Sequence, residues 1–179
     1  MKPIIITGGP GAGKTTLLDA LGQRNYATFA ESSRQLIEQQ SQIEDGILPW
    51  VDLPAFAKLC LDVMAKQKHQ AEEHNLAFLD RAIPDICGYL KQAELDIDTC
   101  YIEGCKGYHP TVFFCRPESS IYVQDEVRPY PFEGAIAIHD ALVQVYLELG
   151  FEIVEVPFMS AEERVEFVLE KLEARELES

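Results

Sequence analysis

The chain has 179 residues, of which 47% are hydrophobic and 25% are charged, and these are ordinary values for a globular protein with a buried core. Its net charge is −15 and its pI is near 4.6. This charge argues against a nucleic-acid-binding surface and against docking on anionic lipid, because both need basic patches. The length predicts a single domain over residues 1–179.

Targeting signals are not evident in the sequence. No apolar run reaches the about 18 residues that a membrane-spanning helix needs. The first residues run from Met1 directly into an apolar stretch, so we expect no signal peptide. The cysteines are scattered and odd in number, so we expect reduced thiols in a cytoplasmic protein; they are Cys60, Cys87, Cys100, Cys105 and Cys115.

The first motif in the chain is a phosphate-binding loop. Residues 4–16 read Ile-Ile-Ile-Thr-Gly-Gly-Pro-Gly-Ala-Gly-Lys-Thr-Thr and contain the spacing Gly-x-x-x-x-Gly-Lys-Thr. The three isoleucines predict a parallel strand that is buried on both faces. The residues after Thr15 place Leu17, Leu18 and Leu21 on one face of a helix. The loop therefore joins the end of a strand to the start of a helix, which is the context that the motif requires.

This loop, the P-loop, predicts nucleotide binding. The first turn of a helix has unpaired N–H groups and the positive end of the helix dipole, and glycines let the backbone approach an anion closely. Lys14 adds a charge that reaches the β- and γ-phosphates, and the Thr15 hydroxyl is placed to bind Mg²⁺. We expect ATP and Mg²⁺ as cofactors, with nucleotide contacts from Gly8, Gly9, Pro10, Gly11, Ala12, Gly13, Lys14, Thr15 and Thr16.

The next third of the chain alternates strands with helices. Residues 26–30 predict a short strand, and a helix follows from a serine cap at Ser32. Residues 41–52 contain a glycine, a proline and the only tryptophan, and predict a loop. A helix begins at Pro54, and an apolar strand covers residues 76–80. A short helix opens at Pro84.

The last third continues this alternation. Residues 94–110 support no assignment beyond an irregular or partly helical connection, and residues 111–115 predict a fourth strand. Residues 117–134 carry three prolines and no helical period, which is typical of a functional lid. A helix over 135–149, a fifth strand over 151–156 and a last helix behind a Ser160–Glu163 capping box complete the chain.

Strands that alternate with helices predict an α/β fold with a five-stranded parallel sheet flanked by helices. Ligands of such sheets bind at the carboxyl ends of the strands. In this sequence those ends carry the P-loop, Glu31, the pair Asp80-Arg81, and Arg116.

The pair Asp80-Arg81 follows the apolar run Leu-Ala-Phe-Leu. In a protein with a P-loop, this is the position of the second carboxylate that holds Mg²⁺, so we predict that Asp80 supports the metal. Arg81 has two interpretations. Its planar guanidinium can clamp a phosphate or a substrate hydroxyl, or it can form a salt bridge with Asp80 or Asp85.

Glu31 lies where an acceptor substrate would bind, and its carboxylate can orient or deprotonate an attacking hydroxyl. The alternative is an acid that only complements the dipole of the following helix. Arg34 is one helical turn further on and faces the same side. It can bind an anionic acceptor or pair with Glu31, and we count Glu31, Arg34 and Arg81 as candidate substrate-binding residues.

The predicted lid contains Asp125-Glu126-Val127-Arg128. Arg128 can move onto the transferring phosphate as an arginine finger from the same chain, or it can remain a solvent-exposed side chain in a loop. We therefore predict four catalytic residues: Lys14, Glu31, Asp80 and Arg128. The four histidines are isolated in the sequence, so we expect surface or capping roles for them; they are His69, His74, His109 and His139.

Together these motifs resemble a known group, the AAA-type ATPase family that includes NadR-like nicotinamide riboside kinase domains. The resemblance rests on the P-loop, Glu31-x-x-Arg34, Leu79-Asp80-Arg81, Asp125-x-x-Arg128 and a final Leu-Gly-Phe turn into a strand, and it covers nearly the whole chain. It implies a kinase-like fold with an arginine-bearing lid, ATP and Mg²⁺. Some animal relatives are discussed as GTP- and phospholipid-binding proteins. The guanine-reading sequence Asn-Lys-x-Asp is absent, which favours ATP.

The sequence thus predicts a Mg²⁺-dependent phosphotransferase that uses ATP on a small nucleoside- or riboside-like acceptor. The alternative is a nucleotide-binding switch or slow NTPase that uses ATP or GTP and acts through a protein or lipid partner. A kinase needs an acceptor for rapid ATP turnover, whereas a switch does not.

Overall fold

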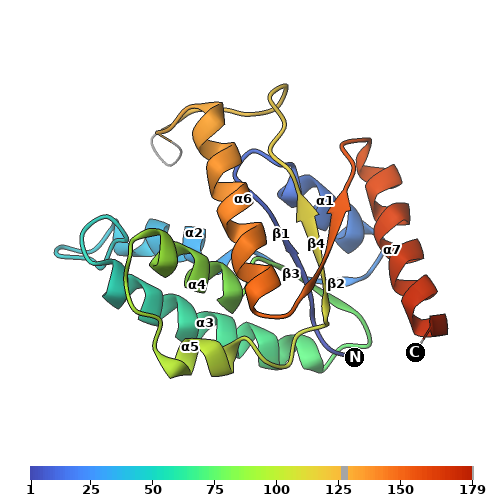
Figure 1. Cartoon of the computed structure of the whole chain (residues 1–179), viewed down its shortest axis with the longest axis horizontal. Helices are drawn as coiled ribbons and strands as arrows, with labels where there is room; N and C mark the ends of the chain where they lie inside the picture. Colours follow the sequence, from blue (N-terminus) through green and yellow to red (C-terminus); the bar gives the residue numbers. More distant parts are fainter. Residues whose placement is uncertain (126–128, 179) are drawn as a thin grey trace.

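The computed structural model describes residues 1–125 and 129–178. A parallel sheet with the strand order β2-β3-β1-β4-β5 forms its centre (Figure 1). The strands are β1 (Ile4–Thr7), β2 (Ala27–Phe29), β3 (Ala77–Asp80), β4 (Thr111–Cys115) and β5 (Glu152–Val156). The helices are α1 (Lys14–Gln23), α2 (Ser32–Gln40), α3 (Leu53–Glu72), α4 (Ile83–Gln92), α5 (Thr99–Gly104), α6 (Phe132–Glu148) and α7 (Ala161–Glu178).

The parallel register follows from the helical connections between the strands. All four strand pairs are parallel, and β1 lies between β3 and β4. Ile6 pairs with Asp80, and Thr7 pairs with Phe114, so the carboxyl ends of the three central strands meet at one edge. The predicted five-stranded parallel sheet flanked by helices is confirmed. The P-loop follows β1 at the edge where ligands of such sheets bind.

The central strands are buried on both faces because helices cover both. Ile5, Leu79 and Phe114 point to one side and join a core with α3, α4 and α6. Ile4 and Ile6 point to the other side and join a second core with α1 and α7. Figure 1 shows α7 and α1 on one side of the sheet and α3, α4 and α6 on the other. Every residue of β1, β3 and β4 is buried, which explains their continuous apolar runs.

The observed helices differ from the predicted ones at three places. Residues 99–104, which had no assignment, form the short helix α5. Helix α6 begins at Phe132, after Pro131 at its N-cap, so the predicted lid loses its last three positions to a helix. The serine cap of α2 is wrong. Glu31 occupies the N-cap position there, and the Ser32 hydroxyl instead donates to Gln67 on α3.

The last helix begins as predicted. The amide of Glu163 donates to the Ser160 hydroxyl at 3.2 Å, and the amide of Ser160 donates to the Glu163 carboxylate at 3.0 Å. Helix α7 packs against α1 in the second core. Arg24 of α1 then pairs with Glu162 and Glu166 on α7.

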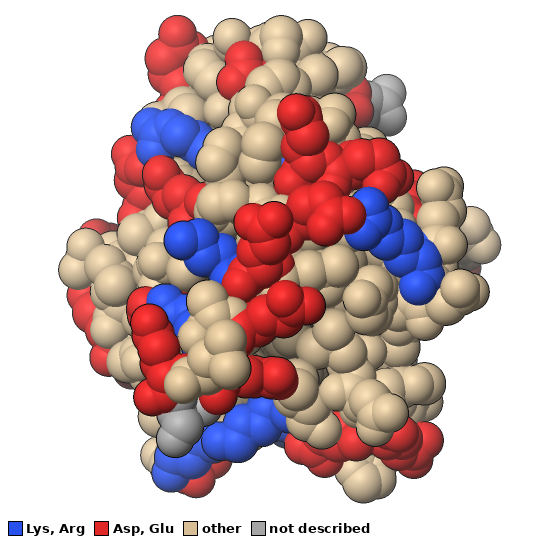
Figure 2. All heavy atoms as spheres, turned by 90° about the vertical axis from the view of Figure 1, so that its right-hand side faces the viewer, with Lys and Arg blue, Asp and Glu red and all other residues tan. Residues whose placement is uncertain are grey.

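The surface is acidic, in keeping with the net charge of −15. Figure 2 views the molecule from the side where α7 lies in Figure 1, and acidic side chains outnumber basic ones on this face. Such a face repels the nucleic-acid backbone. None of the helices within residues 1–125 and 129–178 is both long and apolar enough to cross a membrane.

Candidate active site

The P-loop owes its shape to three glycines with positive φ angles. Gly8, Gly11 and Gly13 have φ values of 141°, 71° and 75°, which side chains rarely tolerate. At Gly8 there is also no room, because a Cβ atom would lie 1.9 Å from the carbonyl oxygen of Cys115 on β4. The backbone therefore curls tightly between β1 and α1. Its N–H groups at the start of α1 form the kind of cradle that binds phosphate.

Two side chains from distant helices hold this loop, and sequence reasoning missed both roles. His139 on α6 is fully buried, and its Nδ1 accepts a hydrogen bond from the Gly9 amide at 3.1 Å. Arg164 on α7 is also buried and donates to the Gly13 carbonyl at 3.0 Å. The expectation that His139 is a surface or capping residue is wrong. Its contact spans 130 positions along the chain, which no local pattern reveals.

Lys14 lies at the first turn of α1 and is only 8% exposed. Burial lowers the pKa of its ammonium group, and the nearby Arg81 lowers it further, whereas Asp80 and Glu31 raise it. An anion that binds nearby stabilises the charged form of a buried ammonium group, which burial otherwise makes unfavourable. A phosphate in the cradle would supply that anion.

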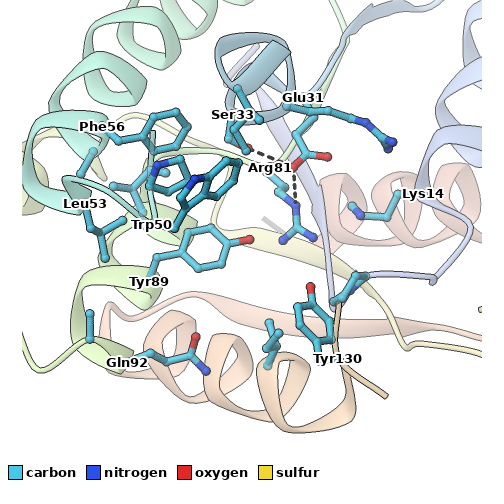
Figure 3. Close-up of a pocket in the computed structure, with 18 residues that line it drawn as sticks. Lys14, Glu31, Ser33, Trp50, Leu53, Phe56, Arg81, Tyr89, Gln92 and Tyr130 are labelled. Atoms are coloured by element: carbon cyan, nitrogen blue, oxygen red, sulfur yellow. Dashed lines mark hydrogen bonds and ion pairs between the residues drawn. The ribbon is translucent and has the colours of Figure 1, made fainter. Parts of the chain in front are cut away.

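Glu31 and Arg81 meet although they come from different strand ends. The Nε atom of Arg81 lies 3.3 Å from Oε1 of Glu31, and the Ser33 hydroxyl donates to the same oxygen at 2.9 Å (Figure 3). Burial raises the pKa of the Glu31 carboxyl, but Arg81 and Lys14 outweigh it, and the net pKa is below the usual value. Glu31 is therefore ionised at neutral pH. Arg81 and Ser33 both contact its Oε1 atom.

A second carboxylate, Asp85 on α4, fixes the other side of the Arg81 guanidinium. Asp85 is fully buried, and its Oδ1 lies 3.3 Å from Nη1 of Arg81. It also accepts hydrogen bonds from the hydroxyls of Thr7 and Tyr146, each at 2.5 Å. Arg81 itself has a φ angle of 63°, an uncommon value for a residue with a side chain. Of the two earlier interpretations of Arg81, the salt bridge to Asp85 is present, and a contact with Glu31 is added.

Asp80 ends β3 and points into a cavity of about 340 Å³ that Thr15 and Glu31 also line. Its side chain is only 6% exposed, and within the described residues its Oδ1 has no hydrogen-bond partner. Burial raises the pKa of the Asp80 carboxyl, and Lys14 lowers it in part. A buried carboxylate oxygen without a partner, in a cavity that a threonine also lines, is a donor set that fits Mg²⁺.

A large cavity at the site has a volume of about 520 Å³ and begins at Lys14, Glu31 and Arg81. Figure 3 shows these charged side chains at one end and Trp50, Leu53 and Phe56 at the other. Tyr89 lies between the two ends with its hydroxyl directed toward Arg81. The volume is within the range of small-molecule sites, about 300–1,000 Å³.

A further cavity of about 420 Å³ adjoins the P-loop at Ala12. Arg116 and Pro117 at the end of β4 line it, together with Pro157 and Phe158 beyond β5. Its walls thus come from neighbouring strand ends. The P-loop lies between this cavity and the larger one, because Ala12 lines the first and Lys14 the second.

The AAA domain family model matches residues 3–164, which is most of the chain. The chain belongs to the AAA domain family. A search of curated proteins finds no match. Structural similarity extends to a deoxyadenosine kinase from M. mycoides with bound dATP, at a TM-score of 0.67 and 16% identity, over 97% of this chain and 100% of that one.

Two other solved structures share the fold of this AAA domain. The NadR protein in complex with NR matches at a TM-score of 0.66 and 18% identity, over 96% of this chain and 50% of that chain. Shikimate kinase from Acinetobacter baumannii in complex with shikimate matches at a TM-score of 0.61 and 16% identity, over 99% of this chain and 96% of that chain. At these identities the likeness shows a common P-loop kinase fold. The three structures contain different ligands, so the ligand of this chain must be inferred from its own residues.

The AAA domain brings most of the predicted residues together. Lys14, Glu31, Arg34 and Arg81 all line the large cavity, and Asp80 lines the adjoining one with Thr15. Arg34 is half exposed and pairs with Glu38 within α2 at 4.0 Å. Of its two predicted roles, the ion pair with Glu31 is not formed, and binding of an anionic acceptor stays a prediction. Arg128 lies outside the described residues.

The wall of the large cavity opposite these charges was not predicted. It comes from the loop before α3, from α3 itself and from α4, and its larger side chains are Trp50, Leu53, Phe56, Tyr89 and Gln92. Phe56 also belongs to the hydrophobic core. The single tryptophan in a predicted loop was the one sequence signal for this wall. A tryptophan that is exposed in a turn does not stabilise the core, so it indicates a binding role.

Proposed function

We propose that this AAA domain is a Mg²⁺-dependent phosphotransferase that moves the γ-phosphoryl group of ATP to a hydroxyl of a small nucleoside- or riboside-like acceptor. One observation carries the proposal: Lys14 of the P-loop and the ionised Glu31 line the same cavity. A nucleotide on the P-loop would thus have its terminal phosphate at the mouth of a space that is large enough for a second substrate.

The donor would bind with its phosphates on Gly8–Thr16. The backbone N–H groups and the dipole of α1 favour the negative charge, and Lys14 neutralises part of it. The base of ATP would then occupy the cavity between Arg116 and Phe158, on the other side of the loop. That assignment leaves the larger cavity for the acceptor.

Thr15 and Asp80 would hold Mg²⁺. The partnerless Oδ1 of Asp80 and the Thr15 hydroxyl border one cavity and have the oxygen chemistry that the ion prefers. When bound, Mg²⁺ neutralises charge on the β- and γ-phosphate oxygens. It also removes the cost of the buried Asp80 charge, because it supplies the missing partner.

Glu31 would orient the acceptor hydroxyl. Its Oε1 is engaged by Arg81 and Ser33, so Oε2 would accept the hydrogen bond from the hydroxyl. The hydroxyl oxygen then bonds to the γ-phosphorus, the bond to the β–γ bridging oxygen breaks, and ADP leaves. The hydroxyl proton passes to Glu31 and on to solvent. Because the pKa of Glu31 is lowered, its main contribution is alignment rather than strong base catalysis.

The arginines would differ in their tasks. Arg81 is held by Glu31 and Asp85, so it would position Glu31 and contact the acceptor from a fixed place. Arg34 would contact the acceptor from the rim of the cavity. Arg128 would be the arginine finger that stabilises charge on the transferring group. This last role rests on the sequence pattern alone.

The test is a measurement of ATP consumption with Mg²⁺ over a panel of ribosides, nucleosides, nucleotides and small alcohols. A kinase should consume ATP slowly without acceptor and at least tenfold faster with one member of the panel, about 1.4 kcal/mol of barrier. Equal turnover with every compound and with none would contradict the proposal and favour the nucleotide-binding switch.

A further inference from the structure

The large cavity has a charged end and an end without charge. Figure 3 shows Lys14, Glu31 and Arg81 together, with Trp50, Leu53 and Phe56 on the opposite wall. The uncharged end comes from the loop before α3, from α3 and from α4. The Gln92 amide is a polar group in its lining. An acceptor that fills the cavity must therefore fit two different environments at once.

Within the described residues, the charged end offers an anionic acceptor no cation that is free of other partners. Lys14 belongs to the donor phosphates. Arg81 already faces two carboxylates, at 3.3 Å from Glu31 and 3.3 Å from Asp85. Arg34 is half exposed and lies 4.0 Å from Glu38. A phosphate on the acceptor would need unpaired cations around it and would instead meet the ionised Glu31, beside the charge of the donor itself.

The uncharged end is equally unsuited to a carboxylate. In the described part of the chain, its lining residues carry no cation, and a carboxylate buried there would lose its hydration without a partner. The same wall suits a flat ring. Trp50 is 67% exposed although it lines a cavity, so a ligand can cover its face. Phe56 and Tyr89 border the same space, and the Gln92 amide offers one donor and one acceptor group to a ring edge.

We infer that the acceptor is an unphosphorylated nucleoside, with its base against Trp50 and Tyr89 and a sugar hydroxyl at Glu31, and that nucleoside monophosphates and small hydroxy acids are rejected. The inference rests on the proposed function for the identity of the acceptor cavity. It goes further in choosing one acceptor class. Two features carry it: the balanced charges around Arg81, and the aromatic wall without cations.

Trp50 provides a direct assay, because it is the only tryptophan of the chain. Its fluorescence, excited at the red edge of its absorption band, can be titrated without ATP. The ligands are the common ribonucleosides and deoxyribonucleosides, their 5′-monophosphates, and shikimate. At least one nucleoside should change the emission with saturation, and its 5′-monophosphate should bind at least tenfold more weakly. The inference is overturned if the monophosphate or shikimate binds as tightly as the nucleoside or more tightly. It is also overturned if no compound binds.

The charge argument has its own variant. Glu31→Gln removes the repelling charge and keeps the shape of the side chain. The preference for nucleoside over monophosphate should then fall by about tenfold, measured as a ratio of dissociation constants. Glu73→Gln is the control, because it removes an equal charge from the exposed end of α3, outside the cavity lining. An unchanged ratio in Glu31→Gln would contradict the charge argument.

The aromatic wall is tested by Trp50→Leu, with binding measured by calorimetry because the reporter is lost. Nucleoside affinity should fall by about tenfold, the order of one lost ring–base stacking contact, while ATP affinity stays unchanged. The neighbouring Val51→Ala serves as control, because Val51 is 71% exposed and does not line the cavity. Equal losses in both variants would mean that the loop, and not the ring, is responsible.

These measurements separate the inference from the proposed function. If nucleosides bind as expected but receive no phosphate from ATP, the acceptor class stands and the kinase proposal fails. If ATP phosphorylates a monophosphate or a hydroxy acid, the kinase proposal stands and the inference fails.

Discussion

The amide nitrogen of Gly9 lies 3.1 Å from Nδ1 of His139. This bond ties the P-loop to α6, the helix that follows the predicted lid. A neutral imidazole can accept a hydrogen bond at Nδ1, whereas a protonated one has only donors. The phosphate cradle is therefore linked to the protonation state of a buried histidine.

We predict that the cradle loses stability on mild acidification. Burial lowers the pKa of His139 from the ordinary 6.5, and Arg116 lowers it further, against Glu155 and Asp140, which raise it. Because the folded pKa is below the unfolded one, the unfolded chain takes up the proton first as the pH falls. The stabilisation is thus complete above pH 6.5 and is lost progressively below it, until the folded pKa is reached. Thermal unfolding between about pH 8 and pH 5 measures this loss.

His139→Asn should flatten this pH dependence, because the Asn oxygen can still accept from Gly9 but does not titrate. His69→Asn is the matched control, since His69 has an 81% exposed side chain on α3. The His139 variant should also keep its ATP affinity at low pH better than the wild type. An identical pH slope in all three proteins would remove His139 from the explanation.

Lys14→Ala should weaken ATP binding or slow turnover by at least tenfold, about 1.4 kcal/mol. The substitution removes the one P-loop side chain that can place a positive charge against the phosphates. Calorimetric ATP titration measures the change. Lys66→Ala, which removes an exposed lysine from α3, should leave ATP affinity unchanged. If the Lys14 variant binds and consumes ATP as the wild type does, the P-loop assignment is wrong.

Asp80→Asn should act in opposite directions with and without metal. The pKa of Asp80 is raised by burial, so the ionised carboxylate is less favourable in the folded chain than in the unfolded one at neutral pH. Without Mg²⁺, the neutral Asn should therefore raise the unfolding temperature. With Mg²⁺ and ATP, the variant should need about tenfold more Mg²⁺ for turnover, because a ligand-sphere carboxylate is lost. A Mg²⁺ titration identical to the wild type would make Asp80 an ordinary buried acid.

The fold was predictable because each signal for it is local. The run Ile4–Ile6, the glycines before Lys14 and the capping box at Ser160 each depend on residues close in the sequence, and each appears in the structure as expected. The strand ends could also be located, because in a parallel sheet they share one edge. The sequence alone therefore places Glu31 and Asp80 at the site.

The missing parts of the site depend on contacts between distant segments. Nothing near His139 in the sequence indicates that it faces Gly9, and Arg164 belongs to an amphipathic helix where it reads as an exposed residue. The serine cap at Ser32 failed for a similar reason. A tertiary partner, Gln67 on α3, binds the hydroxyl that the local rule assigns to the helix end. Local rules give the strand ends, whereas the packing of α6 and α7 decides what surrounds them.

Glu31→Gln should separate binding from transfer. The variant keeps the size of the side chain, so ATP affinity should stay within about twofold of the wild type, because the donor contacts lie on the P-loop. Acceptor-dependent transfer should fall by about 10²-fold, the order of loss that follows from a misaligned reactant. Steady-state kinetics with a saturating acceptor measures kcat, and an ATP titration measures binding.

A graded comparison shows whether orientation is the cause of that loss. Ser33→Ala removes the hydroxyl that donates to Glu31 Oε1 at 2.9 Å but leaves Arg81 in place, so kcat should fall by less than in Glu31→Gln. The pKa of Glu31 is lowered from the ordinary 4.5, so its carboxylate is ionised at neutral pH. Wild-type transfer should therefore show no loss from Glu31 protonation near neutral pH. If Glu31→Gln weakens ATP binding and leaves transfer intact, Glu31 contacts the donor. The acceptor end of the cavity must then be assigned to other groups.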